Sequence, residues 1–314
     1  VGEGIGGSEE AIIHLAPLLA AKGWNVEVYN NCLEEGNYDG ALWKPFWTYD
    51  PSVPCDVFIV WRDSRNLLLA PKEAFTILWL HDMVKAEHFS PEHLNAIDEV
   101  WALSHYHAEV ARQAIPEPIP IWVTSNGIRP SQFEGHEPRD PLRCIYASSP
   151  DRGLDTLLQV WPDIRAKVPD AELHVFYGFT KNFDEIHRRN PKMLEFKDWC
   201  LKALQQPGVT YHGRVGHTQL AKEFLKSSLW TYPTQFTEIS CLTAMKAQAA
   251  GAIPVTAALA ALNETVKHGY KVSFSFADRR TQLSFVNIVV DLLQHPEKQQ
   301  KMRGLMQAWA KQQF

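Results

Sequence analysis

The stretch that decides the fold is PTQFTEISCLTAMKAQAAGAIP, which runs from Pro233 to Pro254. A strand is expected to end at its Pro-Thr pair, and Glu238 leads into a helix of small residues that stops at Gly251. An apolar strand follows directly. A strand, a polar turn, a short helix and a second strand in this order are typical of a parallel sheet covered by helices.

The same alternation of apolar strands and helix-length amphipathic segments extends along the rest of the chain, and it predicts the α/β class. Five of the predicted strands precede residue 130 and five follow it. The ten predicted strands are Asn25–Tyr29, Asp56–Trp61, Phe75–Leu80, Glu99–Leu103, Ile121–Thr124, Arg143–Ala147, Glu172–Tyr177, Val209–His212, Leu229–Tyr232 and Ile253–Thr256.

A polar, proline-rich segment, EGHEPRDP from Glu134 to Pro141, separates the two sets of strands and has the composition of a linker. The chain has 314 residues, of which 45% are hydrophobic, so it can form two ordinary cores. We therefore expect two domains, residues 1–135 and residues 136–314.

Composition excludes several functional classes. A net charge of -5 leaves no broad basic field, which argues against a nucleic-acid partner. The five cysteines form neither a CxxC pair nor a zinc-like cluster, so we expect no structural metal and a reducing, cytoplasmic setting. No apolar run approaches the ~20 residues that a membrane span needs, while peripheral membrane contact stays open.

Glycines near the beginning of the chain allow two interpretations. Gly2, Gly4 and Gly7 match the dinucleotide fingerprint GxGxxG, but that motif needs a preceding strand and an acid at the end of the next strand, and the sequence predicts neither. Alternatively, Gly6 and Gly7 with Ser8 open a helix from Glu9 to Lys22, whose amides suit a phosphate or an oxyanion. A tight turn capped by Ser8 explains the same residues without a ligand.

Three positions in the second half follow predicted strands, where ligands of open α/β sheets collect. Arg152, in YASSPDRGLDTLL, could clamp a diphosphate with its planar fork, or it could pair with Asp151 or Asp155 on the surface. Gly178 and Arg214 could line a cleft, although such residues also simply terminate strands.

Glu238 precedes a helix whose start is flanked by Ser240 and Thr243. The backbone amides of residues 239–242 would point from that helix end toward an anion. Glu238 either complements the helix dipole or accepts hydrogen bonds from sugar hydroxyls, and the residues alone do not separate these roles.

Taken together, these motifs resemble glycosyltransferase family four, whose retaining enzymes have the GT-B fold of two Rossmann-like domains facing a cleft. The resemblance rests on motifs spread over nearly the whole chain, and four carry most of it: Gly6-Gly7-Ser8-Glu9, His81 of LWLHD, Asn126-Gly127 and Arg152-Gly153. A fifth matching motif is the E-x7-E helix that starts at Glu238.

The resemblance implies that a hexose or N-acetylhexosamine moves from a nucleoside-diphosphate sugar to a hydroxyl of a sugar, glycan or lipid-linked acceptor. It implies neither a metal nor another cofactor, because a cationic side chain and a helix dipole stabilise the leaving diphosphate. The implied catalytic residues are His81, Glu238 and Gly7. The implied donor-binding residues are Gly6, Arg152, Gly178, Arg214, Ile239, Ser240, Cys241, Leu242 and Lys246.

Four features depart from the family pattern. Lys246 occupies the second acid position, where a carboxylate usually accepts hydrogen bonds from the ribose, and a lysine can only donate. Ser148 and Ser149 stand where the family has a further arginine. The family's first strand, which lies in the middle of the sheet, and its closing helix have no counterpart here. We therefore expect an incomplete sheet in the N-terminal domain, with low-stability opening concentrated before residue 60.

Two other functional classes remain as alternatives. A protein that binds a sugar or a sugar nucleotide with little turnover would explain Lys246. A sugar-nucleotide epimerase of similar architecture would release its product without an acceptor.

Overall fold

The computed structural model describes residues 5–116, 118–273 and 275–314, and the chain forms two compact units, Ile5–Asn126 and Gly127–Phe314. Residues 127–135, which the sequence placed in the first domain, belong to the second unit. These residues pack against segments of the second unit that lie far away in the sequence. Phe133 is buried in the core of the second unit, and the backbone N–H of Ile128 donates to the carbonyl oxygen of Phe314.

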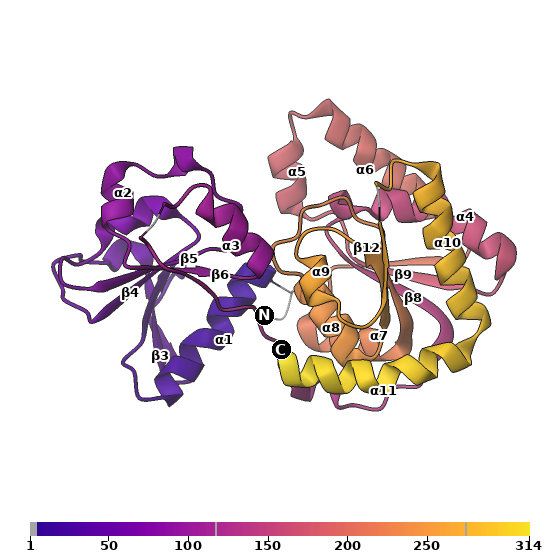
Figure 1. The fold of residues 1–314 in the computed structure, drawn as a ribbon, viewed down its shortest axis with the longest axis horizontal. Helices are drawn as coiled ribbons and strands as arrows, with labels where there is room; N and C mark the ends of the chain where they lie inside the picture. The colour runs from indigo at the N-terminus through magenta and orange to yellow at the C-terminus, as the bar shows by residue number, and fades with distance from the viewer. Residues whose placement is uncertain (1–4, 117, 274) are drawn as a thin grey trace. The chain divides into compact units, whose positions relative to one another are not determined.

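The C-terminal unit contains one six-stranded sheet in the order β10-β9-β8-β11-β12-β13, and all of its strand pairs are parallel (Figure 1). Its strands are β8 (Asp140–Ser148), β9 (Glu172–Tyr177), β10 (Val209–Gly213), β11 (Ser227–Tyr232), β12 (Ile253–Ala257) and β13 (Tyr270–Val272). Every residue of β11 and β12 is buried, as expected for central strands covered on both faces.

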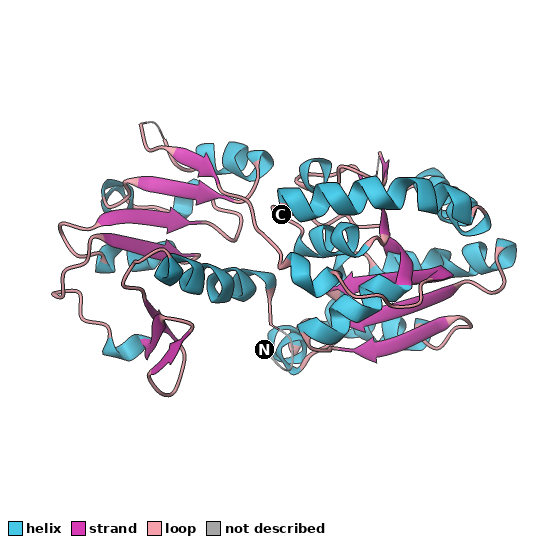
Figure 2. Cartoon of the chain, turned by 90° about the horizontal axis from the view of Figure 1, so that it is seen from below, coloured by secondary structure: helices cyan, strands magenta, loops and turns pink. Residues whose placement is uncertain are grey.

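Helices lie on both sides of this sheet (Figure 2). Helix α8 packs against α7 and α11, while α4 packs against α6 and α10. The α-helices are α4 (Leu154–Lys167), α5 (Lys181–His187), α6 (Pro191–Ala203), α7 (His217–Lys226), α8 (Leu242–Ala250), α9 (Leu262–Thr265), α10 (Arg279–Gln294) and α11 (Pro296–Gln313). Two short 3-10 helices, η4 (Pro130–Phe133) and η5 (Pro150–Arg152), flank β8.

The N-terminal unit contains a four-stranded parallel sheet in the order β4-β5-β6-β7. Its strands are β4 (Val57–Trp61), β5 (Phe75–Trp79), β6 (Glu99–Ala102) and β7 (Ile121–Val123). The helices of this unit are α1 (Gly7–Ala21), α2 (Pro91–Asn95), α3 (His105–Arg112), η1 (Phe46–Thr48), η2 (Ser64–Leu69) and η3 (Ala86–His88).

A second, smaller sheet of the N-terminal unit has the order β1-β3-β2 and stands apart from the four-stranded sheet (Figure 2). It consists of β1 (Glu27–Asn30), β2 (Gly36–Tyr38) and β3 (Ala41–Pro45), with β1 parallel and β2 antiparallel to β3. The predicted strand Asn25–Tyr29 therefore exists but does not join the other four. Because β1 pairs with β3 and not with β4, β4 is an edge strand that pairs only with β5 among the described strands.

All ten predicted strands are present, with ends shifted by a few residues, and three strands were not predicted: β2, β3 and β13. The α/β class is confirmed. Within the described residues, no helix is both long and apolar enough to cross a membrane.

Candidate functional site

The candidate site of the C-terminal unit is built around a buried carboxylate. Glu238 is 5% exposed, and its Oε1 accepts hydrogen bonds from the hydroxyl of Tyr232 at 2.7 Å and from Nη1 of Arg152 at 3.3 Å. Arg152 and Glu238 lie 86 positions apart in the sequence. The carboxyl ends of the neighbouring strands β8 and β11 bring them together.

Gly153 fixes the position of the arginine. Its φ is +104°, in the left-handed region, and a Cβ there would lie 2.4 Å from the carbonyl oxygen of Pro233. Only glycine lets the loop after β8 pack this closely on the Pro-Thr turn after β11. The guanidinium of Arg152 also stacks on the ring of Phe236, with 3.9 Å from its central carbon to the ring centroid.

Burial is the largest influence on the acidity of Glu238, and it raises the pKa of this carboxyl above its ordinary value. Arg152 and the Tyr232 hydroxyl stabilise the carboxylate and offset part of that rise. A buried carboxylate with a raised pKa and a specific cationic partner, placed at the carboxyl edge of a parallel sheet, is a candidate binding group.

Helix α8 begins at Leu242 with Cys241 at the N-cap and ends at Gly251, whose φ is +87°. The predicted stop at Gly251 is therefore correct. Ile239 and Ser240 lie before the helix. Lys246 is half-buried on α8, one turn after its start. Burial raises the pKa of the Cys241 thiol well above its ordinary value, so this cysteine is a packing residue.

The remaining predicted donor-binding residues follow β9 and β10. Gly178 has a φ of +69°, and a Cβ on it would overlap the hydroxyl of Tyr211 at 1.8 Å. The preceding Tyr177 also has a positive φ, +83°, which is uncommon for a tyrosine. The guanidinium of Arg214 lies over the Tyr177 ring at 4.9 Å. The two strand ends thus form one contact region.

In the N-terminal unit, α1 begins at Gly7, with Gly6 as its N-cap. Ser8 is not the cap; it lies in the first turn, and its hydroxyl donates to Oε2 of Glu9 at 3.1 Å. A Cβ on Gly6 would lie 2.2 Å from the same Glu9 oxygen. Gly2 and Gly4 fall outside the described residues.

His81 follows β5, a central strand, and is 8% exposed. Its ring contacts two indoles, with centroid distances of 4.5 Å to Trp79 and 6.1 Å to Trp61. Desolvation, aided by the charge of Arg62, lowers the pKa of His81 to about 3, so the imidazole is neutral. In the described part of the chain, its Nε2 has no hydrogen-bond partner.

Sequence reasoning missed three functional candidates: Arg62, Asp82 and Tyr232. Tyr232 is the last residue of β11, and Arg62 directly follows β4. The signal that could have found them is their place at the carboxyl ends of parallel strands.

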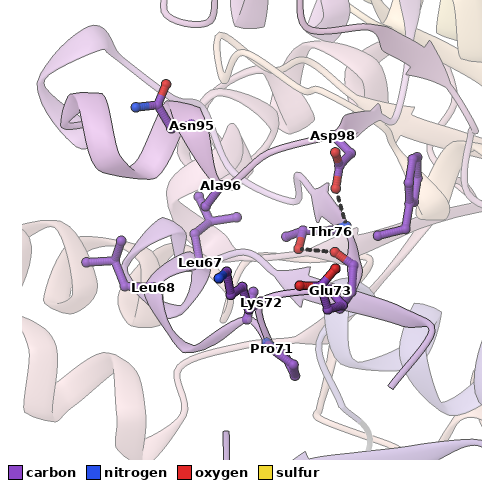
Figure 3. A pocket seen from close by; sticks show the side chains of 12 residues that line it. Leu67, Leu68, Pro71, Lys72, Glu73, Thr76, Asn95, Ala96 and Asp98 are labelled. Atoms are coloured by element: carbon purple, nitrogen blue, oxygen red, sulfur yellow. Dashed lines mark hydrogen bonds between the residues drawn. The ribbon is translucent and has the colours of Figure 1, made fainter. Parts of the chain in front are cut away.

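A pocket of about 540 Å³ lies at the opposite, amino end of the four-stranded sheet (Figure 3). Thr76 of β5 and Asp98, just before β6, line it and are joined by a hydrogen bond of 2.7 Å from the Thr76 N–H to Asp98 Oδ2. Lys72 and Glu73 lie at its rim. None of the predicted site residues lines this pocket.

Within the described ranges, no three His, Cys, Asp or Glu side chains gather in a way that could hold a metal ion. The five cysteines are free.

With this geometry established, comparison with known proteins gives the family. Residues 136–304 match the family model described as glycosyl transferases group 1, and this chain belongs to that family. The match covers most of the C-terminal unit. No curated protein sequence matches the chain significantly.

Solved structures show where the fold recurs. Sucrose-phosphate synthase from Thermosynechococcus elongatus has 16% identity and a TM-score of 0.74, over 99% of this chain and 90% of that one. HepE from Anabaena, in complex with UDP and glucose, has 16% identity and a TM-score of 0.63, over 82% of this chain and 74% of that one. A chain of the GtfA/B complex has 18% identity and a TM-score of 0.61, over 83% of this chain and 55% of that one.

These structures are glycosyltransferases with the GT-B fold, and the fold predicted for this chain is confirmed. The chain spans only about half the length of the protein in the GtfA/B complex.

Proposed function

We propose that this glycosyltransferase transfers a hexose or N-acetylhexosamine, with retention of anomeric configuration, from a nucleoside diphosphate to an acceptor hydroxyl. A bond forms between the acceptor oxygen and the anomeric carbon, the bond from that carbon to the diphosphate breaks, and the hydroxyl proton leaves with the diphosphate or to solvent. The observation that carries the proposal is the buried Glu238 beside Arg152 at the carboxyl edge of the sheet.

Each group has a role that its chemistry suits. Glu238 would accept hydrogen bonds from donor-sugar hydroxyls, since an ionised carboxylate is only an acceptor. Arg152 directs Nη1 to Glu238, and its other N–H groups would bind the diphosphate. The first amides of α8 would add positive potential at the same edge, and the ammonium of Lys246 on this helix would be a further cation for the phosphates.

In the N-terminal unit, His81 would lie beside the donor hexose as a neutral imidazole, and Gly6 and Gly7 would let the substrate approach the start of α1. Gly178 and Arg214 would line the donor site after β9 and β10. We propose that transfer needs no metal, because Arg152 and the helix dipole act on the leaving diphosphate.

Lys246 favours a second candidate, a sugar-nucleotide binding protein with little turnover. A ribose hydroxyl that loses a charged acceptor is bound roughly ten- to hundredfold more weakly. We therefore expect weak activity, and the test must measure both binding and turnover.

The experiment is a screen of UDP-, GDP- and ADP-sugars that follows release of the nucleoside diphosphate. Glu238→Ala is the test variant, and Glu195→Ala, an exposed glutamate on α6, is the matched control. Release that Glu195→Ala keeps and Glu238→Ala loses supports the transferase. Donor binding without release, in folded protein, favours the binding protein instead.

A further inference from the structure

Arg62 has a backbone conformation that arginine seldom adopts. It follows β4 at the carboxyl edge of the four-stranded sheet, and its φ of +67° lies in the left-handed region. A strained residue of this kind persists where its surroundings hold it, and such residues cluster at functional sites. The contacts of its side chain show what holds it.

The guanidinium joins three segments of the N-terminal unit. Its Nε donates to Oδ2 of Asp82 at 2.6 Å, and its Nη1 donates to the hydroxyl of Ser8 at 3.2 Å and to Oε1 of Glu9 at 3.5 Å. Arg62 thereby ties the first turn of α1 to the loops after β4 and β5. These are the ends of the elements that carry Gly7 and His81.

Asp82 is anchored from a further element. The backbone N–H of Leu103 donates to Nδ1 of His107, so the neutral His107 carries its proton on Nε2 and donates it to the carbonyl oxygen of Asp82 at 3.1 Å. Burial lowers the pKa of His107, which keeps this imidazole neutral. The Asp82 backbone is thus fixed while its carboxylate stays available.

The formal charge of this cluster is negative, because two carboxylates face one guanidinium. Their side chains are about half exposed, 55% for Asp82 and 45% for Glu9, so each keeps acceptor positions open to solvent. His81 nearby is neutral and adds no positive charge. The two carboxylate charges exceed the guanidinium charge plus the roughly half positive charge of the α1 N-terminus, so a phosphate or carboxylate ligand would meet net repulsion here, whereas a hydroxyl can donate to either acid.

The indole ring of Trp61 also belongs to this cluster. The Arg62 guanidinium lies over the Trp61 ring at 5.3 Å, and the Trp61 ring in turn contacts that of His81. The half-buried Trp61 thus contributes apolar surface beside the carboxylate acceptors, which suits the mixed apolar and hydroxyl surface of a sugar. Among the described residues, the buried His81 Nε2 also lacks the partner that a ligand hydroxyl would provide.

We infer, on the basis of the proposed function, that the acceptor is an uncharged polyol bound through Glu9 and Asp82, and that Arg62 is the positioning residue that holds both carboxylates. A phosphorylated acceptor is disfavoured. The negative charge of this cluster in the N-terminal unit therefore selects the class of acceptor. This selection does not depend on how the C-terminal unit binds the donor.

The test compares sugars with their own phosphate esters, namely glucose with glucose 6-phosphate and fructose with fructose 6-phosphate. Equilibrium binding is measured by ligand-observed NMR on the full chain. In each pair we expect the neutral sugar to bind about tenfold or more tightly than the ester. Asp82→Asn should reduce the ratio of the affinity for the neutral sugar to the affinity for its ester, because the variant removes one negative charge.

Arg62→Lys tests the positioning role, since lysine keeps the charge but cannot hold two carboxylates and a hydroxyl with one planar fork. We expect about tenfold weaker binding of the neutral sugar and unchanged binding of the donor nucleotide. Arg65→Lys is the control, because Arg65 is 84% exposed and pairs only with Asp63 in the described structure. Backbone circular dichroism checks the folding of each variant.

Tighter binding of the esters, no binding of any sugar by folded wild-type protein, or equal affinities in Arg62→Lys and wild type would each overturn the inference. The two proposals fail separately. If neutral sugars bind through Glu9 and Asp82 while no donor is turned over, the transferase fails and the assignment of a site for a neutral sugar stands.

Discussion

The two units use similar secondary structure to different effect. The C-terminal unit forms one continuous six-stranded parallel sheet, whereas the seven strands described in the N-terminal unit are divided between a four-stranded and a three-stranded sheet. Among the described residues, the main core of the C-terminal unit contains 44 buried apolar side chains, and that of the N-terminal unit contains ten. The continuous sheet of the C-terminal unit is covered by helices on both faces, which allows more apolar side chains to be buried.

The difference has an energetic consequence. Stabilisation by burial scales with the apolar area removed from water, so the N-terminal unit gains much less from its core. Several large apolar side chains of that unit are exposed, including Trp24, Leu33, Trp47 and Val53. We expect the C-terminal unit to be rigid and the N-terminal unit to open more easily.

The largest effect should come from matched core truncations. Leu78 of β5 and Leu173 of β9 are both 0% exposed, and replacing either by alanine should cost about 2–5 kcal/mol. Because the N-terminal unit has less stability to lose, Leu78→Ala should unfold it while the other unit stays folded. Denaturant unfolding followed by far-UV circular dichroism would show this as a lost first transition. A single shared transition in both variants would remove the distinction between the units.

Acid should destabilise the N-terminal unit through His81. Its pKa is about 3 in the folded protein and ordinarily 6.5, so the unfolded chain binds the proton first. Stability is therefore full above pH 6.5 and falls as the pH drops toward 3, by at most roughly 5 kcal/mol in total. Unfolding free energies of wild type and His81→Gln across this window would test it. Parallel pH profiles of the two proteins would rule out a buried neutral His81.

The rigidity of the C-terminal unit can be probed at two of its glycines. Gly153 and Gly213 both have positive φ, but a Cβ on Gly153 would clash with Pro233, whereas nothing lies within 4 Å of one on Gly213. Gly153→Ala should therefore cost about 2 kcal/mol more than Gly213→Ala, which bears only backbone strain. Thermal unfolding gives the stability difference. Equal losses would mean that the turn after β11 moves freely.

A smaller effect is expected at Lys246. Under the proposed function, Lys246→Glu would offer a carboxylate acceptor to the ribose and should strengthen donor binding about tenfold, with a parallel gain in turnover. Isothermal titration with the donor found in the screen measures the affinity. Tighter binding without any turnover would favour the binding-protein alternative. Weaker binding would show that Lys246 serves the diphosphate.

The smallest expected effect is a difference in hydrogen-exchange rate between the two sheets of the N-terminal unit. Amides of β1 and β3 should exchange with solvent faster than those of β5, because the small sheet lies outside the main core of that unit. Hydrogen-exchange mass spectrometry on the native protein resolves these peptides. Exchange that is equally slow before residue 60 and throughout the C-terminal unit would contradict the expected weakness of the first sheet.

Much of the fold could be read from local pattern. The ten predicted strands are runs of apolar residues, and each is present in the structure. The missed strands β2 and β3 are short and contain glycine or proline, so their pairing gives no periodic signal. The sequence predicted only part of the candidate site. Glu238 and Arg152 were singled out from motif and position, but Arg62 and Asp82 were not, because no local rule pairs residues 20 positions apart.

The sequence alone determined the α/β class, the strand-turn-helix unit around Glu238 and its end at Gly251, because periodicity and glycine act over a few neighbouring residues. Tertiary structure decided three other features. It divided the first seven strands between two sheets, it placed Arg152 against Glu238, and it held Arg62 in a left-handed conformation between Glu9 and Asp82. These depend on which strand edges meet, and that is settled by packing between segments far apart in the chain.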